Sequence, residues 1–423
     1  MEVGVGVGSP PLVLTVIIEN AGELFGIDGV IPGSCVGIIG DTVVALGDLG
    51  GFDTRSAVRL DARGGLVTGG LVDAHTHLVF AGDRADEHAL RARGATYLEI
   101  AEGGGGIAST MRQTRACPVE VLVLEATRRL DRLLLGGVTT TEIKSGYGLD
   151  AQSELKLLHA IKRLSETHPM EIVPTFLGAH TIPPEHRSNR TRYVDLVVEE
   201  MLPEVAEGRL ARFCDVFVER GAFEPQEAVR ILGRARSLGL GVKLHVDQLT
   251  AGGGAELAAH LGATSADHLE HVSPAGITAL ARAGTVAVLL PGAGLFLGED
   301  VRPPARALLD AGVPVAIATD CNPGTCPSTN LGLMMTLAVS RLHMQPDEAL
   351  RAVTSSAARA LDLPPRLAGL TIGAQADVAI FGVPTHRHLP YAFGADVTRA
   401  VVKRGKILFE REPCPSFSSL TTR

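Results

Sequence analysis

The chain of 423 residues lacks the features that mark membrane, exported and nucleic-acid-binding proteins. It contains no uninterrupted apolar run of the roughly 20 residues that a membrane-spanning helix needs. The first basic residue is Arg55, so the positively charged segment of a secretory or targeting signal is absent. With a net charge of -8 and no basic stripe, the sequence also lacks the cations that neutralise nucleic-acid phosphates.

The sequence also lacks paired-cysteine motifs and phosphate-binding loops. The six cysteines form no CxxC pair, and in a long chain without an export signal they are expected to be reduced thiols. The glycine run at residues 103–106 is not followed by Lys-Ser or Lys-Thr, which excludes a phosphate loop. The sequence therefore predicts a cytoplasmic protein that binds a small molecule and neither nucleic acid nor membranes.

The middle of the sequence alternates short apolar runs rich in β-forming residues with longer segments of helical periodicity. This alternation is typical of βα units around a parallel sheet. The eight predicted strands span residues 66–74, 138–144, 172–179, 213–219, 241–246, 264–270, 285–291 and 313–319. Because eight strands close a TIM barrel, we predict an α/β fold with a (β/α)8 barrel over residues 66–364.

The two ends of the sequence have a different character. Residues 11–60 and the segment that follows residue 369 consist of short predicted strands separated by turns. Neither end is long enough to bury an ample core alone. We therefore expect residues 1–65 and 365–423 to form one small β-sandwich domain against the barrel.

Two histidines stand one residue apart in the segment LVDAHTH, at the end of the first predicted strand. Residues i and i+2 of a strand point to the same side. His75 and His77 are therefore placed to bind one metal ion at the carboxyl ends of the strands, where TIM-barrel enzymes build their sites. For this pair alone, one hydrogen-bonded core histidine beside one exposed histidine is an equally good interpretation.

Other predicted strands end in residues of the same kind, which are His180, His245, His268 and Asp320. Because the carboxyl ends of barrel strands meet at one mouth, these side chains are expected to converge. His75, His77, His245 and Asp320 would supply three nitrogens and one oxygen, a set that suits one zinc or iron ion and leaves room for water. Such an ion lowers the pKa of its water to about 7, which indicates a hydrolase with Asp320, assisted by His268, as proton acceptor.

The chain resembles the amidohydrolase superfamily in the order of LVDAHTH, His245, His268 and Asp320. Members of that superfamily hydrolyse C–N bonds on a TIM barrel with an attached β-sandwich. Longer segments narrow this resemblance. The chain resembles the imidazolonepropionase family of histidine degradation in five segments. These are HLVFAGDRADEHALRARGATYLEIAEGGGGI, EIKSGYGLD, LGAHTIPPE, HVDQ and TDCNPGTCP. The resemblance implies ring opening of 4-imidazolone-5-propanoate to N-formimino-L-glutamate, with one zinc or iron ion, in a homodimer.

The resemblance also implies roles for individual residues. The four metal ligands correspond to those named above, and Asp320 and His268 take the catalytic roles. Arg84 corresponds to the arginine that binds the substrate carboxylate, a role that suits its planar, permanently charged fork. The remaining substrate-contacting positions correspond to Tyr147, His180, Gln248, Asn322, Gly324 and Thr325.

One position differs from some relatives, which carry glutamate three residues after the strand-five histidine, where this chain has Gln248. An amide forms hydrogen bonds but is no base near neutral pH, so we expect a binding role. Two weaker alternatives concern metal ligation. In the first, Lys144 would be the bridging carbamate of two-metal relatives, although its KSGYG context favours one metal. In the second, Cys321 and Cys326 would be ligands because they flank Asp320, although no sequence pattern supports this.

Two other functions fit parts of the sequence. The metal ligands alone equally support a deaminase of a purine, a pyrimidine or a related heterocycle. A cation such as Arg84, together with Tyr147, instead favours a substrate that carries a carboxylate. A barrel that has lost catalysis and serves in binding or assembly is the second alternative, and the intact ligand set argues against it.

Overall fold

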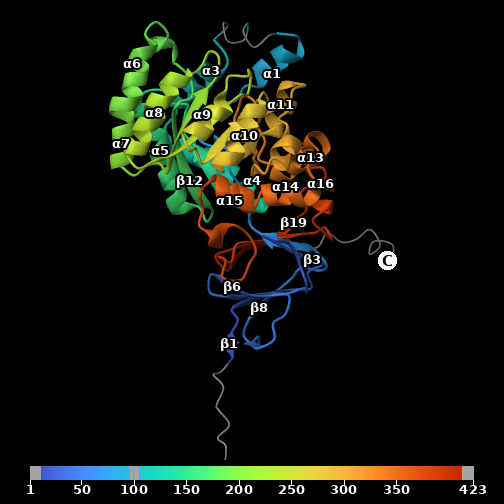
Figure 1. Ribbon diagram of the computed structural model, residues 1–423. Coiled ribbons are helices and arrows are strands. Elements are labelled where there is room, and N and C mark those ends of the chain that lie inside the picture. The colour runs from blue at the N-terminus through green and yellow to red at the C-terminus, as the bar shows by residue number, and fades with distance from the viewer. Residues whose placement is uncertain (1–10, 96–98, 100–103, 412–423) are drawn as a thin grey trace, which may run out of the picture.

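The computed structural model describes residues 11–95, 99 and 104–411. The first ten and last twelve residues of the predicted terminal domain, Cys414 among them, lie outside the described residues, as does the first residue of the glycine run. Figure 1 shows a helix-covered barrel at one end of the molecule and the β-sheets of the two termini at the other.

Eight parallel strands pair in chain order, which confirms the predicted barrel. The sheet closes between its first and last strands just beyond their ends, where the Asp320 amide donates to the His75 carbonyl at 3.0 Å and the His77 amide donates to the Cys321 carbonyl at 3.0 Å. The strands are β10 (Leu71–Asp73), β11 (Val138–Lys144), β12 (Glu171–Ala179), β13 (Phe213–Val218), β14 (Gly241–Val246), β15 (Ser265–His268), β16 (Val286–Leu289) and β17 (Val315–Ile317).

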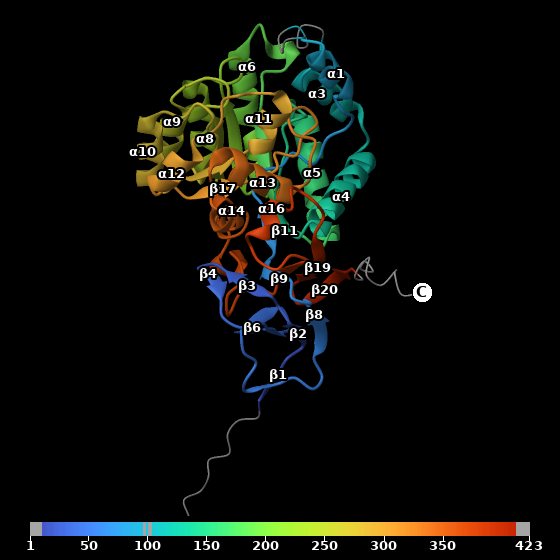
Figure 2. The same ribbon diagram turned by 90° about the vertical axis from the view of Figure 1, so that its right-hand side faces the viewer.

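Helices cover the outside of the barrel (Figures 1 and 2). They are α1 (Ala85–Ala92), α3 (Ile107–Ala116), α4 (Val119–Leu135), α5 (Ala151–Thr167), η1 (Pro184–His186), α6 (Arg190–Asp195), η2 (Leu196–Met201), α7 (Leu202–Glu207), α8 (Pro225–Ser237), α9 (Gly254–His260), α10 (Pro274–Ala283), α11 (Pro291–Leu297), α12 (Ala305–Asp310), α13 (Leu331–Leu342), α14 (Pro346–Ala352), α15 (Ser355–Ala360), η3 (Pro365–Leu367) and α16 (His388–Tyr391). Proline and glycine stand at the limits of some of these helices. Helix α4 follows Pro118 and ends at Gly136, and α8 begins at Pro225.

The two termini meet in one set of sheets, as predicted. A six-stranded sheet joins β20 (Lys406–Glu410), β19 (Thr398–Lys403), β18 (Val378–Phe381), β9 (Leu66–Gly69), β3 (Glu23–Gly26) and β4 (Gly29–Ile31). A four-stranded sheet holds β6 (Thr42–Leu46), β5 (Val36–Ile39), β2 (Val16–Glu19) and β8 (Val58–Asp61), and a third pairs β1 (Leu12–Val13) with β7 (Phe52–Asp53). Apolar side chains of the two larger sheets share one core, which includes Ile18, Leu60 and Val378.

The first predicted barrel strand, residues 66–74, is two strands that belong to different sheets. Its first half, β9, pairs with β18 and β3 of the terminal sheet, and its second half, β10, pairs with β11 of the barrel. The break falls at Gly69 and Gly70, because a Cβ atom on Gly69 would overlap the backbone of Gly369 and one on Gly70 would overlap Thr139. One continuous apolar run thus links the terminal sheets to the site.

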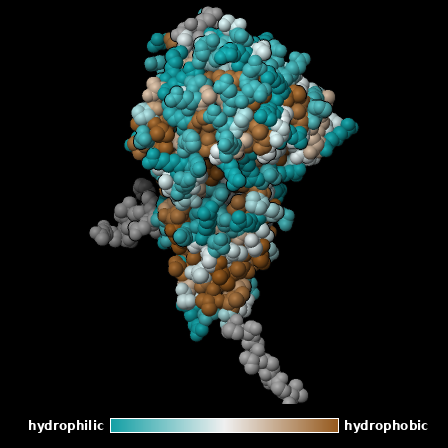
Figure 3. All heavy atoms as spheres, turned by 90° about the vertical axis from the view of Figure 1, so that its left-hand side faces the viewer, coloured by the Kyte–Doolittle hydropathy of each residue, from teal (hydrophilic) through white to brown (hydrophobic). Residues whose placement is uncertain are grey.

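The surface differs between the two ends of the molecule. Large apolar side chains of the terminal sheets and their turns are exposed, among them Leu12, Val30, Val58 and Ile372. Figure 3 shows apolar residues gathered over this end, whereas the far end of the barrel is mostly hydrophilic. None of the helices in the described ranges combines the length and the apolar character that a bilayer span requires.

Candidate metal-dependent active site

Four histidines and one aspartate converge where the barrel strands end, at the end of the barrel remote from the terminal sheets. Oδ1 of Asp320 lies 3.5 Å from Nε2 of His75 and 3.5 Å from Nε2 of His77. The His75 ring centre is 4.5 Å from that of His245 and 5.9 Å from that of His268. All five residues are buried. The convergence predicted from the strand ends is therefore present in the fold.

The arrangement fits a metal ion. His75, His77 and Asp320 offer ligand atoms that all lie within 4.8 Å of one another, and so do His75, His245 and His268. Nε2 of His75 and of His245 is buried and has no hydrogen-bond partner among the described residues. Because a buried nitrogen without a partner is costly, these atoms are suited to a cation that completes their bonding. Nitrogen and oxygen donors of this kind suit zinc and iron alike.

Two aspartates that the sequence analysis did not single out orient the histidines. Nδ1 of His75 lies 2.6 Å from Oδ2 of Asp267, and Nδ1 of His245 lies 3.0 Å from Oδ1 of Asp215. A carboxylate accepts a hydrogen bond from Nδ1, which leaves the Nε2 lone pair free for a metal. Asp267 stands directly before His268 in β15, and this adjacency is the sequence feature that could have identified Asp267 as part of the site.

Burial sets the charge of the site. It lowers the pKa of His75 well below the usual value of 6.5 and also lowers the pKa of His245 and His180. These histidines are therefore neutral near pH 7, and neutral imidazole is the form that binds a metal. Burial alone would raise the pKa of Asp320, but attraction to His77 and the other histidines lowers it, so the carboxylate is ionised.

His268 differs from the other histidines. Burial favours its neutral form, but the negative charges of Glu270 and Asp320 outweigh burial and raise the pKa of His268. Nδ1 of His268 lies 3.8 Å from Oε2 of Glu270, which is too long for a hydrogen bond and short enough for charge attraction. The surroundings of His268 thus favour its protonated form.

The residues after Asp320 form a tight hydrogen-bonded loop. Oδ1 of Asn322 accepts from the amides of Gly324 and Thr325 at 2.8 Å each, and its Nδ2 donates to the Asp320 carbonyl at 2.7 Å. The Thr325 hydroxyl donates to Oδ2 of Asp320 at 3.1 Å. Asn322 and Thr325, predicted as substrate contacts, therefore hold the catalytic loop, and their direct contact with substrate stays a prediction.

Arg84 lies beside this loop. It precedes α1, is partly buried, and its Nε donates to the Thr110 hydroxyl at 2.9 Å. A Cβ atom on Gly324 would overlap the Arg84 guanidinium, so a larger residue at this position would displace the end of the Arg84 side chain. Arg91 of α1 reaches the same loop and donates to the Gly324 carbonyl at 3.2 Å. Sequence analysis had not identified Arg91, which lies seven residues, or about two helical turns, after Arg84.

Tyr147 and His180 line the mouth next to His77. The His180 and His77 rings are stacked, 5.3 Å apart at 16°, and Nδ1 of His180 lies 3.0 Å from the Gly146 carbonyl. The Tyr147 ring centre lies 5.9 Å from that of His77, and burial raises the pKa of the phenol, so its hydroxyl remains a hydrogen-bond donor. Both residues are thus placed beside the metal ligands.

Gln248 lies in the loop after β14, three residues from His245, and is partly exposed. Glu219 accepts hydrogen bonds from the amides of Leu249 at 2.8 Å and Thr250 at 3.2 Å, and Asp247 accepts from Gly252 and Gly254 at 3.0 Å each. The loop that carries Gln248 is therefore fixed at both ends, although its contact with substrate stays a prediction.

Backbone strain is concentrated at the same strand ends. Asp247, His268, Leu269 and Asp320 have φ angles of 51°, 82°, 69° and 51°, in the left-handed region. For residues with a Cβ atom this conformation costs about 1–2 kcal/mol each. Such outliers cluster at functional sites, where the surrounding structure holds them in place.

The alternative metal ligands Lys144, Cys321 and Cys326 do not fit. The Lys144 ammonium lies 2.8 Å from Oε2 of Glu142 and 2.7 Å from Oδ2 of Asp215, so it is a cation in ion pairs rather than the neutral amine from which a carbamate forms. Burial raises the pKa of Cys321 to about 12, which keeps this thiol protonated, and thiolate is the ligand form. No cysteine belongs to a candidate metal group in the described part of the chain.

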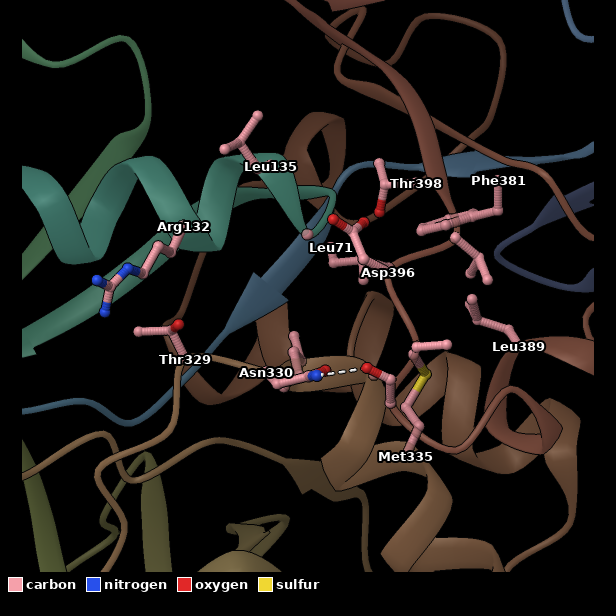
Figure 4. A pocket seen from close by; sticks show the side chains of 16 residues that line it. Leu71, Arg132, Leu135, Thr329, Asn330, Met335, Phe381, Leu389, Asp396 and Thr398 are labelled. Atoms are coloured by element: carbon pink, nitrogen blue, oxygen red, sulfur yellow. Dashed lines mark hydrogen bonds between the residues drawn. The ribbon is translucent and has the colours of Figure 1, made fainter. Parts of the chain in front are cut away.

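A cavity of about 250 Å³ lies at the opposite end of β10, between α4, α13 and the segment after α16. Figure 4 shows Arg132, Asn330, Met335 and Asp396 around it, with Asn330 hydrogen-bonded within the wall. Its lining contains no histidine and no predicted site residue, and Asp396 is already paired with Arg411 at 2.6 Å. The chemistry therefore belongs to the histidine cluster rather than to this cavity.

Comparison with known proteins agrees with this geometry. The model of the amidohydrolase family matches residues 66–408. A 5-methylcytosine deaminase from Klebsiella pneumoniae liganded with 5-fluorocytosine has a TM-score of 0.76 at 17% identity, covering 94% of this chain and 98% of that chain. An adenosine deaminase from Xanthomonas campestris with bound zinc has a TM-score of 0.68 at 19% identity, covering 97% of both chains. At these identities the two structures show a shared fold.

A protein from Symbiobacterium thermophilum is much more similar in sequence. It is named imidazolonepropionase and is 48% identical over 413 residues, which are 96% of this chain and 96% of the relative. With this identity along nearly the whole chain, the protein belongs to the imidazolonepropionase family of amidohydrolases.

Proposed function

We propose that the chain opens the ring of 4-imidazolone-5-propanoate by hydrolysis and releases N-formimino-L-glutamate. Members of this family are hydrolases of C–N bonds. The observation that carries the proposal is the convergence of His75, His77, His245 and Asp320 at one mouth, with the Arg84 guanidinium beside the loop that follows Asp320. The first group suits a metal-assisted hydrolysis, and the arginine suits the propanoate.

We assign one zinc or iron ion to His75, His77, His245 and Asp320. The donor set of three nitrogens and one oxygen supports this assignment, as do the two buried Nε2 atoms without partners among the described residues. When bound, such an ion activates water near neutral pH and polarises a carbonyl oxygen. A second metal has no support, because the ammonium of Lys144 occupies the acidic cluster behind the histidines.

The chain's own residues then have separate tasks. Arg84 binds the propanoate and sets the ring over the mouth, which fixes the reacting carbon in place. Tyr147 and His180 are assigned to contacts with the substrate ring, as is Gln248. Asp320 is ionised and accepts the proton of the attacking water. His268, whose surroundings favour the protonated form, stabilises the negative charge that develops on the carbonyl oxygen.

The reaction consumes one water molecule. Its oxygen forms a bond to the imidazolone carbonyl carbon, and the bond between that carbon and the adjacent ring nitrogen breaks. Asp320 transfers the water's proton to this nitrogen as it leaves, so the carboxylate is regenerated and no other reactant is needed.

The test is to supply freshly generated 4-imidazolone-5-propanoate and follow its loss by absorbance, with product identified by mass spectrometry. Loss should be rapid with metal-loaded protein and should stop after treatment with a chelator. Metal-loaded protein that leaves the substrate unchanged would refute the proposal. Release of ammonia from cytosine or adenosine under the same conditions would instead identify a deaminase, the function of the two similar structures.

A homodimer and a cytoplasmic location belong to the same proposal. Both come from the resemblance and from sequence composition. Sedimentation of the purified protein tests the dimer, and cell fractionation tests the location.

A further inference from the structure

A network of buried ion pairs lies in the barrel interior beneath the histidines. The Lys144 ammonium lies 2.8 Å from Oε2 of Glu142, 2.7 Å from Oδ2 of Asp215 and 3.6 Å from Oδ2 of Asp267. The Lys243 ammonium lies 2.8 Å from Oε1 of Glu142 and 4.0 Å from Oδ2 of Asp267. All five side chains are fully buried. Charges are buried at high cost unless they are paired, so this arrangement is interdependent.

The same two aspartates each hold one of the proposed metal ligands. Asp215 uses Oδ2 for Lys144 and Oδ1 for Nδ1 of His245, so it links the two directly. Oδ2 of Asp267 lies near both Lys144 and Nδ1 of His75. One ammonium therefore connects to two histidines from different strands, through one carboxylate each.

The Lys144 ammonium keeps the two aspartates from repelling each other and from binding another cation. Asp215, His245 and Asp267 offer ligand atoms within 4.8 Å of one another, a group that itself resembles a cation site. The Lys144 ammonium is the positive charge that lies against both of its carboxylates. Its removal would leave three buried carboxylates with Lys243 as the remaining cation, and the aspartates would turn away from one another or attract another ion.

We infer that Lys144 is a positioning residue of the metal site: its ammonium fixes Asp215 and Asp267 so that His245 and His75 direct Nε2 at one point. The inference rests on the proposed metal site. It assigns to Lys144 the role of a built-in cation in place of a second metal ion. The carboxylates raise the pKa of Lys144 against the effect of burial, so it keeps its charge near neutral pH.

The test measures metal affinity directly. Lys144→Met removes the charge and keeps an unbranched side chain. We expect affinity for zinc to fall about 10–100-fold, the usual effect of losing a group that orients metal ligands. Affinity is measured by competition between the metal-free protein and a chromophoric chelator. The visible spectrum of the cobalt-loaded protein should also change, because it reports the arrangement of the ligands.

Lys243→Met is the matched control. It removes the same charge from the same interior, but the Lys243 ammonium pairs with Glu142, donates to the Ala74 carbonyl at 3.2 Å and is farther from Asp267. We expect a smaller loss of affinity and an unchanged cobalt spectrum. Equal losses in both variants would show that the interior needs positive charge without a specific position, and would overturn the inference.

Two further outcomes separate the inference from the proposed function. Wild-type protein that binds no metal would refute the proposed function itself. Wild-type protein that binds metal, together with a folded Lys144→Met variant of equal affinity and equal spectrum, would overturn the inference alone. If Lys144→Met does not fold, Asp215→Asn breaks the next link toward His245. It should lower zinc affinity and change the cobalt spectrum, and unchanged values would again overturn the role of Lys144.

Discussion

The Thr325 hydroxyl donates a hydrogen bond of 3.1 Å to Oδ2 of Asp320. This bond turns Oδ1 of the same carboxylate toward His75 and His77, each with its Nε2 at 3.5 Å. The two carboxylate oxygens therefore have different surroundings. One faces the proposed metal, and the other faces a loop that holds the carboxylate in place.

Asp320→Asn is expected to abolish turnover. The amide has nearly the same shape as the carboxylate and retains an oxygen ligand, but it is no base near neutral pH. General base catalysis of this kind is worth roughly 100- to 10,000-fold in rate. The measurement pairs kcat with metal content by mass spectrometry. A variant that keeps both its metal and its activity would remove Asp320 from proton transfer. Thr325→Val, which loses the orienting bond and keeps the carboxylate, should be less impaired.

Arg84→Met is expected to raise KM much more than it lowers kcat, because the arginine is proposed to bind a carboxylate that does not react. Gly324→Ala should reproduce this effect without changing any charge, since the added methyl group would overlap the Arg84 guanidinium. Steady-state kinetics of the two variants check the prediction, and metal content should stay normal in both. Wild-type saturation behaviour in Arg84→Met would mean that this arginine has a structural role alone.

His180 is expected to make stability depend on pH. Burial lowers its pKa in the folded chain well below the usual 6.5. Below about pH 6.5 the unfolded chain therefore binds a proton that the folded chain excludes, so His180 contributes stability above this pH that is lost as the pH falls. In metal-free protein, His180→Gln should lose less stability than wild type between pH 7.5 and 5.5, by urea unfolding.

The comparison of variants is needed because other groups titrate in the same range. The pKa of Asp73 is raised to about 7 by burial and that of His268 is raised by Glu270 and Asp320, so both oppose the effect of the buried neutral histidines. These groups are the same in wild type and in His180→Gln. Parallel curves for the two proteins would therefore show that His180 takes up a proton in the folded state as easily as in the unfolded state.

The sequence was sufficient to predict the residues that meet at the mouth, because strand ends can be located from local patterns. Apolar runs and turns mark where each strand stops, and the barrel brings those stops together. His75, His77, His245 and Asp320 were each identified from position alone. The terminal sheets were predicted for a similar reason, since two strand-rich ends that cannot each bury a core need one another.

The groups behind the histidines could not be predicted in this way. Alternation places Lys243 on the same side of its strand as His245, but a lysine in a strand is usually exposed, and its burial depends on Glu142 from another strand. The division of residues 66–74 into β9 and β10 could not be predicted either, because it also depends on pairing between distant segments. One partner of β9 is β18, about 300 residues later in the chain, and no local pattern reports such a pairing.

Gly70 is the position at which the chain passes from the terminal sheet into the barrel, and its substitution tests that description. A Cβ atom there would overlap the side chain of Thr139, which is buried and short, so it has nowhere to move. We expect Gly70→Ala to destabilise the protein by about 1–3 kcal/mol, the usual cost of overpacking.

Gly233→Ala is the control, because Gly233 is exposed in α8 with open space around it, and alanine there should stabilise the protein by about 0.5–1 kcal/mol. Melting temperatures of both variants measure the difference, and a Gly70→Ala protein that melts with wild type would mean that β10 shifts freely against β11.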